Sequence, residues 1–105
     1  MKSQNVFENI PCNIEHELFE FLIKSNTVKI ERIISKGHKS PKSAWYDQEE
    51  NEWIMILKGS AELLFENQVS VQLGEGDYIN IPSHKKHKVS WTDPESETIR
   101  LAVHY

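Results

Sequence analysis

The spacing of apolar residues changes once along this chain, from a helical period to an alternating one. Between residues 13 and 24, the apolar side chains recur at the three- and four-residue spacing of a helix face. These positions are Ile14, Leu18, Phe21 and Leu22. Asn13 is a suitable N-cap for such a helix. The pattern predicts a short helix within an N-terminal segment, residues 1–26, that packs on the rest of the protein.

From residue 27 onward, short runs with alternating apolar and polar residues are separated by turn-forming residues. We expect strands over residues 28–34, 43–48, 52–57, 61–65, 69–73, 78–81, 87–91 and 98–104. About eight short strands with regularly spaced turns are typical of an antiparallel sandwich or barrel. The sequence therefore predicts one all-β antiparallel barrel over residues 27–105, with the N-terminal helix packed against it.

One of these predicted strands is apolar on both faces. Its alternating sets are Glu52, Ile54 and Ile56 on one side and Trp53, Met55 and Leu57 on the other. Because both faces are apolar, both must be covered. One set faces the barrel interior, and the other needs either the N-terminal helix or a second subunit. We expect a homodimer, with coverage by the helix within one chain as the alternative.

Length and charge narrow the class of protein. A chain of 105 residues suits a single domain with a real core. Twelve Lys and Arg against sixteen Asp and Glu give a net charge of -4, which argues against nucleic-acid binding. We find neither an apolar leader nor a run long enough to span a membrane. The single cysteine, Cys12, fits a reducing compartment, so we expect a cytoplasmic protein without membrane or nucleic-acid partners.

Two spaced motifs give the strongest signal in the sequence. Glu52 is followed after six residues by Gly59, and Gly76 is followed after five residues by Pro82 and then by His87. Taken together, in this order and with sixteen residues between Gly59 and Gly76, they resemble the two motifs of the cupin superfamily. The resemblance implies a jelly-roll β-barrel that holds a small molecule in its interior.

The resemblance also implies a metal site. In metal-binding cupins the positions that match Glu52 and His87 are both ligands, and a His-x-His pair typically lies three or four residues before the glutamate. This chain has Trp-Tyr-Asp-Gln at residues 45–48 instead, without a histidine. If three residues separate the pair from Glu52, the matching positions are Tyr46 and Gln48; if four residues do, they are Trp45 and Asp47. We favour the first pairing, because the Trp45 side chain cannot bind a metal. The implied ligands are therefore Gln48, Glu52 and His87, with Tyr46 or Asp47 as a further candidate.

Oxygen ligands with a single imidazole favour Mn, Fe or Mg over a tight zinc site, although the sequence does not distinguish among Mn, Fe, Ni and Zn. No organic cofactor is expected. The alternative is a site without metal, in which Glu52 and His87 pair with each other or with Tyr46 in a buried hydrogen-bonded network.

The last predicted strand also has two distinct faces. Arg100, Ala102 and His104 lie on one face, and Ile99, Leu101 and Val103 lie on the other. Either face is compatible with a position in the barrel interior, so the alternation alone does not say whether His104 points inward.

The sequence therefore predicts a small-molecule-binding barrel with a divalent metal at its centre. If the protein is an enzyme, the metal would act as a Lewis acid or activate oxygen, with Tyr46 or His104 as the proton donor. One alternative is a metal-free binding or sensing module in which Tyr46, Gln48, Glu52 and His87 form hydrogen bonds to the ligand. Another is a metal-free isomerase or epimerase that uses His87 with Tyr46.

Overall fold

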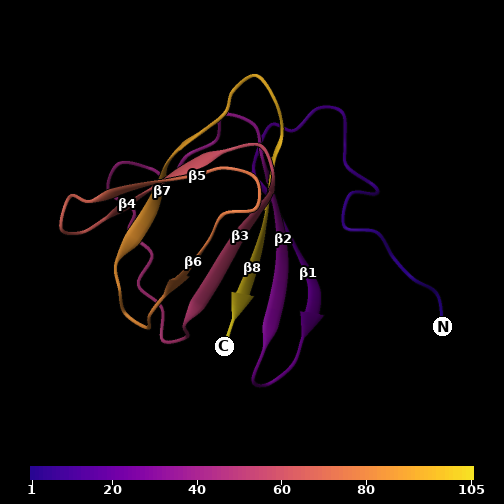
Figure 1. Ribbon diagram of the computed structural model, residues 1–105, viewed down its shortest axis with the longest axis horizontal. Helices are drawn as coiled ribbons and strands as arrows, with labels where there is room; N and C mark the ends of the chain where they lie inside the picture. The colour runs from indigo at the N-terminus through magenta and orange to yellow at the C-terminus, as the bar shows by residue number, and fades with distance from the viewer.

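The computed structural model describes residues 1–105 and consists of eight β-strands joined by turns and loops, with no helix (Figure 1). The strands are β1 (Leu18–Lys24), β2 (Lys29–Ser35), β3 (Glu52–Lys58), β4 (Ala61–Phe65), β5 (Ser70–Leu73), β6 (Tyr78–Ile81), β7 (His87–Thr92) and β8 (Thr98–His104). The last seven agree with the predicted strands to within about two residues at each end.

The strands form two antiparallel sheets that pack face to face. The large sheet has the order β1-β2-β8-β3-β6, and the small sheet has the order β5-β4-β7. Figure 1 shows the small sheet on the left, with the strands of the large sheet running from β6 to β1 toward the right. The expected all-β antiparallel architecture is therefore confirmed.

The core lies between the two sheets. In β3, Ile54 and Ile56 are buried, whereas Trp53, Met55 and Leu57 on the opposite face are only half-buried. The principal apolar cluster contains Ile33, Ile54, Ile56, Ala61, Leu63, Phe65, Leu73, Ile81, Val89 and Ala102. Because Ile54 faces this core, Glu52 must face it as well, two residues earlier on the same strand.

The helix predicted for residues 13–24 is wrong. Leu18–Lys24 forms β1, which pairs with β2 in an antiparallel register that runs from Leu18 opposite Ile34 to Lys24 opposite Lys29. A β-bulge shifts the register between Phe21 and Ile23. The run Leu-Phe-Glu-Phe-Leu-Ile is apolar at helical and alternating positions alike, so its periodicity does not decide between them. The otherwise unpaired edge of β2 favours the strand, because pairing there gives backbone N–H and C=O groups of both segments their hydrogen-bond partners.

The strand predicted for residues 43–48 is also absent. Only Tyr46 pairs there, in an isolated antiparallel bridge with His87 at the start of β7. The Tyr46 amide donates to the His87 carbonyl at 2.7 Å, and the His87 amide donates to the Tyr46 carbonyl at 3.2 Å. This bridge holds the 45–48 segment against the edge of the small sheet, next to the barrel interior.

Residues ahead of β1 contain turns and bends but no regular element, and the chain start lies beyond β1 in Figure 1. This segment is tied to the outer face of the large sheet by Arg32, whose Nη1 donates to the carbonyls of Val6 and Glu8 at 2.8 and 2.7 Å. The structure therefore contains no helix that is long and apolar enough to cross a membrane.

Candidate functional site

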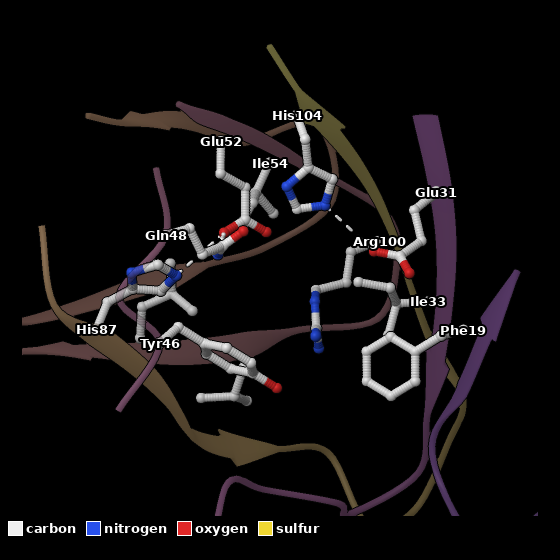
Figure 2. Close-up of a pocket in the computed structure, with 12 residues that line it drawn as sticks. Phe19, Glu31, Ile33, Tyr46, Gln48, Glu52, Ile54, His87, Arg100 and His104 are labelled. Carbon is white, nitrogen blue, oxygen red and sulfur yellow. Dashed lines mark hydrogen bonds and ion pairs between the residues drawn. The ribbon is translucent and has the colours of Figure 1, made fainter. Parts of the chain in front are cut away.

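A cavity of about 290 Å³ opens between the two sheets, and polar side chains line part of its wall (Figure 2). Its polar lining residues are Glu31, Tyr46, Gln48, Glu52, His87, Arg100 and His104. They come from β2, β3, β7, β8 and the 45–48 segment, so five parts of the chain converge on one space. A concave site with a few convergent polar groups in an apolar wall is the usual form of a small-molecule site.

The two sheets meet at a buried ion pair. Glu52 begins β3 in the large sheet, and His87 begins β7 in the small sheet. Their side chains are only 9 and 5 % exposed, and His87 Nε2 lies 3.1 Å from Glu52 Oε1. The Gln48 amide also donates to Glu52 Oε1 at 3.1 Å. The structure thus brings together three of the residues that the sequence singled out.

The hydrogen-bond partners of His87 define its protonation state. Its Nδ1 lies 2.8 Å from the Lys85 carbonyl, which can only accept, so Nδ1 carries a proton. Its Nε2 faces the Glu52 carboxylate, which also accepts, so Nε2 carries a proton as well. This arrangement fits an imidazolium at His87 paired with a carboxylate at Glu52.

The pKa shifts agree with this assignment. Burial alone lowers the pKa of His87, but its hydrogen bonds to Glu52 and to the Lys85 carbonyl outweigh burial and raise it. Burial alone raises the pKa of Glu52, but the hydrogen bond and charge of His87 outweigh burial and lower it. Each partner therefore holds the other in its charged form.

A second histidine–carboxylate pair lies across the cavity. His104, at the end of β8, is directly opposite Glu52 in the β3–β8 register, and its Nε2 lies 3.3 Å from Glu31 Oε1. Its Nδ1 is buried without a hydrogen-bond partner. The open question about β8 is thus resolved: the face with Arg100 and His104 turns inward, as Figure 2 shows.

The Tyr46 ring lies beside the His87 ring, with 5.6 Å between centroids, but neither the Tyr46 hydroxyl nor Asp47 is hydrogen-bonded to the Glu52–His87 pair. Figure 2 shows the Tyr46 hydroxyl directed away from Glu52, toward the Arg100 side of the cavity. Burial, followed by the charge of Glu17, raises the pKa of this phenol, so it remains a hydrogen-bond donor. Asp47 is outside the cavity lining and pairs with the exposed His84 at 2.7 Å.

The donor set does not fit a tightly held divalent metal. No three His, Cys, Asp or Glu side chains are grouped closely enough to share an ion. Glu52 and His87 are two strong donors, but a catalytic zinc site uses three protein ligands. Gln48 supplies only an amide, and a metal at His87 would have to displace the Nε2 proton that pairs with Glu52.

Two groups at the cavity, Glu31 and Arg100, are outside the site predicted from the sequence. Glu31 belongs to a run of charged and apolar residues in β2 whose pattern does not show which side chains face inward. Alternation puts Arg100 on the same face as His104, but only the sheet order β2-β8-β3 shows that this face turns inward. The pattern that points to Arg100 is therefore present in the sequence, and the long-range strand pairing is not.

Comparison with known families gives one match over most of the barrel. Residues 31–104 match a family described as cupin domain. None of the curated proteins matches the chain.

Solved structures extend this match. A protein of Ralstonia eutropha JMP134, described as a candidate mannose-6-phosphate isomerase, is 39 % identical with a TM-score of 0.94, over 99 % of this chain and 97 % of that one. A cupin superfamily protein of Desulfitobacterium hafniense DCB-2 is 20 % identical with a TM-score of 0.75, over 90 % and 82 %. An RmlC-like cupin of Desulfovibrio desulfuricans is 19 % identical with a TM-score of 0.75, over 99 % and 96 %.

Proposed function

This chain belongs to the cupin domain family, and on that premise we propose that its cavity binds a small polar organic molecule without needing a resident metal ion. The observation that carries the proposal is the Glu52–His87 ion pair, which is almost fully buried and lines the cavity. Burying two charges costs several kcal/mol per ion, and packing the site with apolar side chains avoids that cost. Charged pairs that persist in a cleft despite this cost are typical of functional sites.

The pair offers complementary groups to a ligand. Both N–H groups of His87 are used by Glu52 and the Lys85 carbonyl, but Glu52 keeps its second carboxylate oxygen as an acceptor and the Gln48 amide keeps its second N–H as a donor. A hydroxyl or carbonyl group of a ligand therefore finds both kinds of partner within one side of the cavity. Ile33, Ile54, Leu63 and Val89 form the apolar wall against which the carbon skeleton packs.

The proposal is tested by comparing Glu52→Gln with His84→Gln in binding experiments. Glu52→Gln keeps the side-chain shape but removes the carboxylate, whereas His84 forms an exposed pair outside the cavity. We expect hydroxylated ligands such as mannose 6-phosphate or glycerate to perturb the NMR signals of His87 in the wild-type protein and in His84→Gln. Glu52→Gln should weaken this binding at least about tenfold. Equal binding by all three proteins would contradict the proposal.

A second candidate function is proton transfer during isomerisation, and a specific observation favours it. Two histidine–carboxylate pairs line the cavity, and the buried Nδ1 of His104 has no partner. In an aldose–ketose isomerisation, the Nε2–H of His87 would turn from Glu52 to the substrate. Glu52 would remove the C2 proton and return one to C1, while His87 donates its Nε2 proton to O1 and takes one back from the C2 hydroxyl. The structural relative described as a candidate mannose-6-phosphate isomerase supports this reaction class.

The isomerase candidate is tested with mannose 6-phosphate and a coupled assay for fructose 6-phosphate. If the candidate is right, turnover continues in the presence of a chelator, and Glu52→Gln lowers kcat at least about 100-fold. Binding of mannose 6-phosphate without turnover would leave the binding function and exclude this reaction.

A further inference from the structure

Two arginines lie buried on neighbouring strands of the large sheet, and the hydrogen bonds of their terminal nitrogens differ. Arg32 on β2 and Arg100 on β8 are 4 and 3 % exposed. Arg32 faces the outer side of the sheet and is well compensated, with hydrogen bonds of 2.8 and 2.7 Å to the carbonyls of Val6 and Glu8 and an ion pair of 2.7 Å with Glu20. It therefore shows how this protein stabilises a buried guanidinium that has only a structural role.

Arg100 has no comparable partners. Its Nη1 makes two long contacts, both of 3.4 Å, to Glu17 Oε2 and Ser35 Oγ. Its Nε is buried without a partner, as is the Nε of Arg32, so the two arginines differ in the contacts of their terminal nitrogens. Glu17 is itself engaged by the Ser35 hydroxyl at only 2.6 Å, so its carboxylate is directed mainly to Ser35. Such a buried guanidinium is costly, because its Nε–H group has no acceptor and its Nη1 has only long contacts.

The position of Arg100 indicates what completes it. Its side chain enters the cavity between Tyr46 and Phe19, with the guanidinium on the side away from His87 (Figure 2). The protonated Tyr46 hydroxyl is directed toward the same region and adds a second donor. We propose that Arg100, with Tyr46, forms an anion subsite that binds a carboxylate or phosphate group of the ligand. This inference rests on the proposed function, since it assigns the charged end of a ligand whose polar groups contact Glu52 and His87.

The nearby carboxylates do not prevent an anion from binding. Glu52 is paired with His87, and Glu31 is paired with His104. Glu17 keeps its charge, because the Ser35 hydroxyl is neutral, but its contact with Arg100 Nη1 is long, at 3.4 Å, so an incoming anion competes with one distant carboxylate oxygen. Carboxylate and phosphate groups match the planar fork of a guanidinium with two parallel hydrogen bonds, which a lysine cannot reproduce.

The competing interpretation is a structural ion pair, in which Arg100 anchors the segment before β1 through Glu17. The two interpretations differ in the effect of removing the guanidinium. If Arg100 awaits an anion, Arg100→Met in anion-poor buffer should leave the melting temperature unchanged or raise it. Arg32→Met is the matched control and should lower the melting temperature, because it leaves Glu20 and two carbonyls without their donor.

The direct test is a titration of the wild-type protein with acetate and with inorganic phosphate, followed by the NMR signal of the Arg100 Nε–H group. Ionic strength is held constant with sodium chloride. We expect a saturable shift with at least one of the two anions, and the comparison tells whether the subsite prefers a carboxylate or a phosphate. Arg100→Lys should weaken the binding roughly tenfold or more, whereas Arg32→Lys should leave it unchanged.

Glycerate separates this inference from the proposed function, because it adds two hydroxyl groups to the carboxylate of acetate. If both proposals hold, glycerate binds more tightly than acetate, Arg100→Lys weakens both, and Glu52→Gln removes only the advantage of glycerate. An unchanged Glu52→Gln profile would refute the role of the Glu52–His87 pair alone. The anion subsite is overturned if neither acetate nor phosphate shifts the Arg100 signal at about 100 mM, where a millimolar site is saturated. It is also overturned if Arg100→Met destabilises the protein as much as Arg32→Met does.

Discussion

The Glu52–His87 pair determines how the stability of this protein should depend on pH. The folded-state pKa of His87 is raised, so its contribution is complete below the ordinary value of 6.5 and is lost as the pH rises through the folded pKa. The folded-state pKa of Glu52 is lowered, so its contribution is complete above the ordinary value of 4.5 and is lost as the pH falls through the folded pKa. We therefore expect the contribution of the pair to be greatest between pH 4.5 and 6.5.

Denaturant unfolding across the pH range measures this effect. Replacing one partner leaves a buried group unpaired, so Glu52→Gln should lower the free energy of unfolding by about 3 kcal/mol at pH 6 and flatten the profile. His84→Gln, in an exposed pair, should leave the profile unchanged. A wild-type profile that is no different from that of Glu52→Gln would contradict the ion-pair assignment.

The incomplete donor set leads to a prediction for chelation. Without three strong ligands, the folded protein should not depend on a divalent ion, so a chelator should leave the melting temperature unchanged. A metal at one hundred times its dissociation constant would instead add about 2.7 kcal/mol to the free energy of unfolding. A chelator-induced fall in melting temperature that added Mn²⁺ reverses would show that Glu52 and His87 do hold an ion.

Much of the candidate site could be predicted from the sequence. Glu52 and His87 stand at the ends of recognisable motifs, and alternation within short strands places both in the core. The sequence also predicts Tyr46 as a further candidate ligand; its ring does lie beside His87, but its hydroxyl points toward Arg100. That direction depends on the bridge between Tyr46 and His87, which lie far apart in the sequence, and no local pattern encodes such a pairing.

At the scale of elements, two turns differ in why they contain glycine. Gly59, between β3 and β4, has φ of +84°, and an added Cβ would lie 2.5 Å from Thr98 Oγ1 and 2.7 Å from the Glu97 carbonyl. Gly76, between β5 and β6, has φ of +86°, but an added Cβ would meet nothing within 4 Å. The first turn therefore needs glycine for conformation and for space, and the second for conformation only.

These differences predict unequal costs for alanine. Gly76→Ala should lower the free energy of unfolding by about 1 kcal/mol, which is the strain of a left-handed alanine. Gly59→Ala adds a clash with backbone atoms and should cost about 3 kcal/mol or more. Thermal and denaturant unfolding of both variants check the order, and equal losses would contradict the close approach of Thr98 to Gly59.

The element that the sequence misassigned is also the least covered. Phe19, Phe21, Leu22 and Ile23 of β1 are each about half exposed. Because these side chains are not packed in a core, their spacing carries little information on which face is buried, and the helical and strand patterns remain equivalent. The strands with buried faces, such as β3 and β4, were predicted with nearly correct bounds because burial enforces alternation.

At the scale of the whole molecule, β1 leaves the large sheet with an apolar free edge. Exposed edges of this kind pair readily with another strand. An antiparallel pairing of two β1 strands centred on Leu22 would place Glu20 of one copy opposite Lys24 of the other. We therefore expect a homodimer formed through β1, which agrees with the dimer expected from the sequence but uses a different surface.

Analytical ultracentrifugation tests this prediction. The wild-type protein should sediment at twice its chain mass of 12.3 kDa. Lys24→Glu would bring like charges together at the edge and should favour the monomer, whereas Lys36→Glu, on an exposed loop, should not. A monomeric wild-type protein at high concentration would rule out the dimer.

The central claim is that the cavity holds a small organic molecule through charged side chains rather than through a metal ion. Native mass spectrometry tests it most directly, because the mass of each adduct separates organic molecules from metals. The wild-type protein is incubated with the low-molecular-mass fraction of a cell extract, next to Glu52→Gln and Arg100→Lys. We expect an organic anion bound to the wild-type protein and reduced or absent in both variants. A wild-type protein that carries only a divalent metal ion, or an organic adduct of equal intensity in all three proteins, would contradict it.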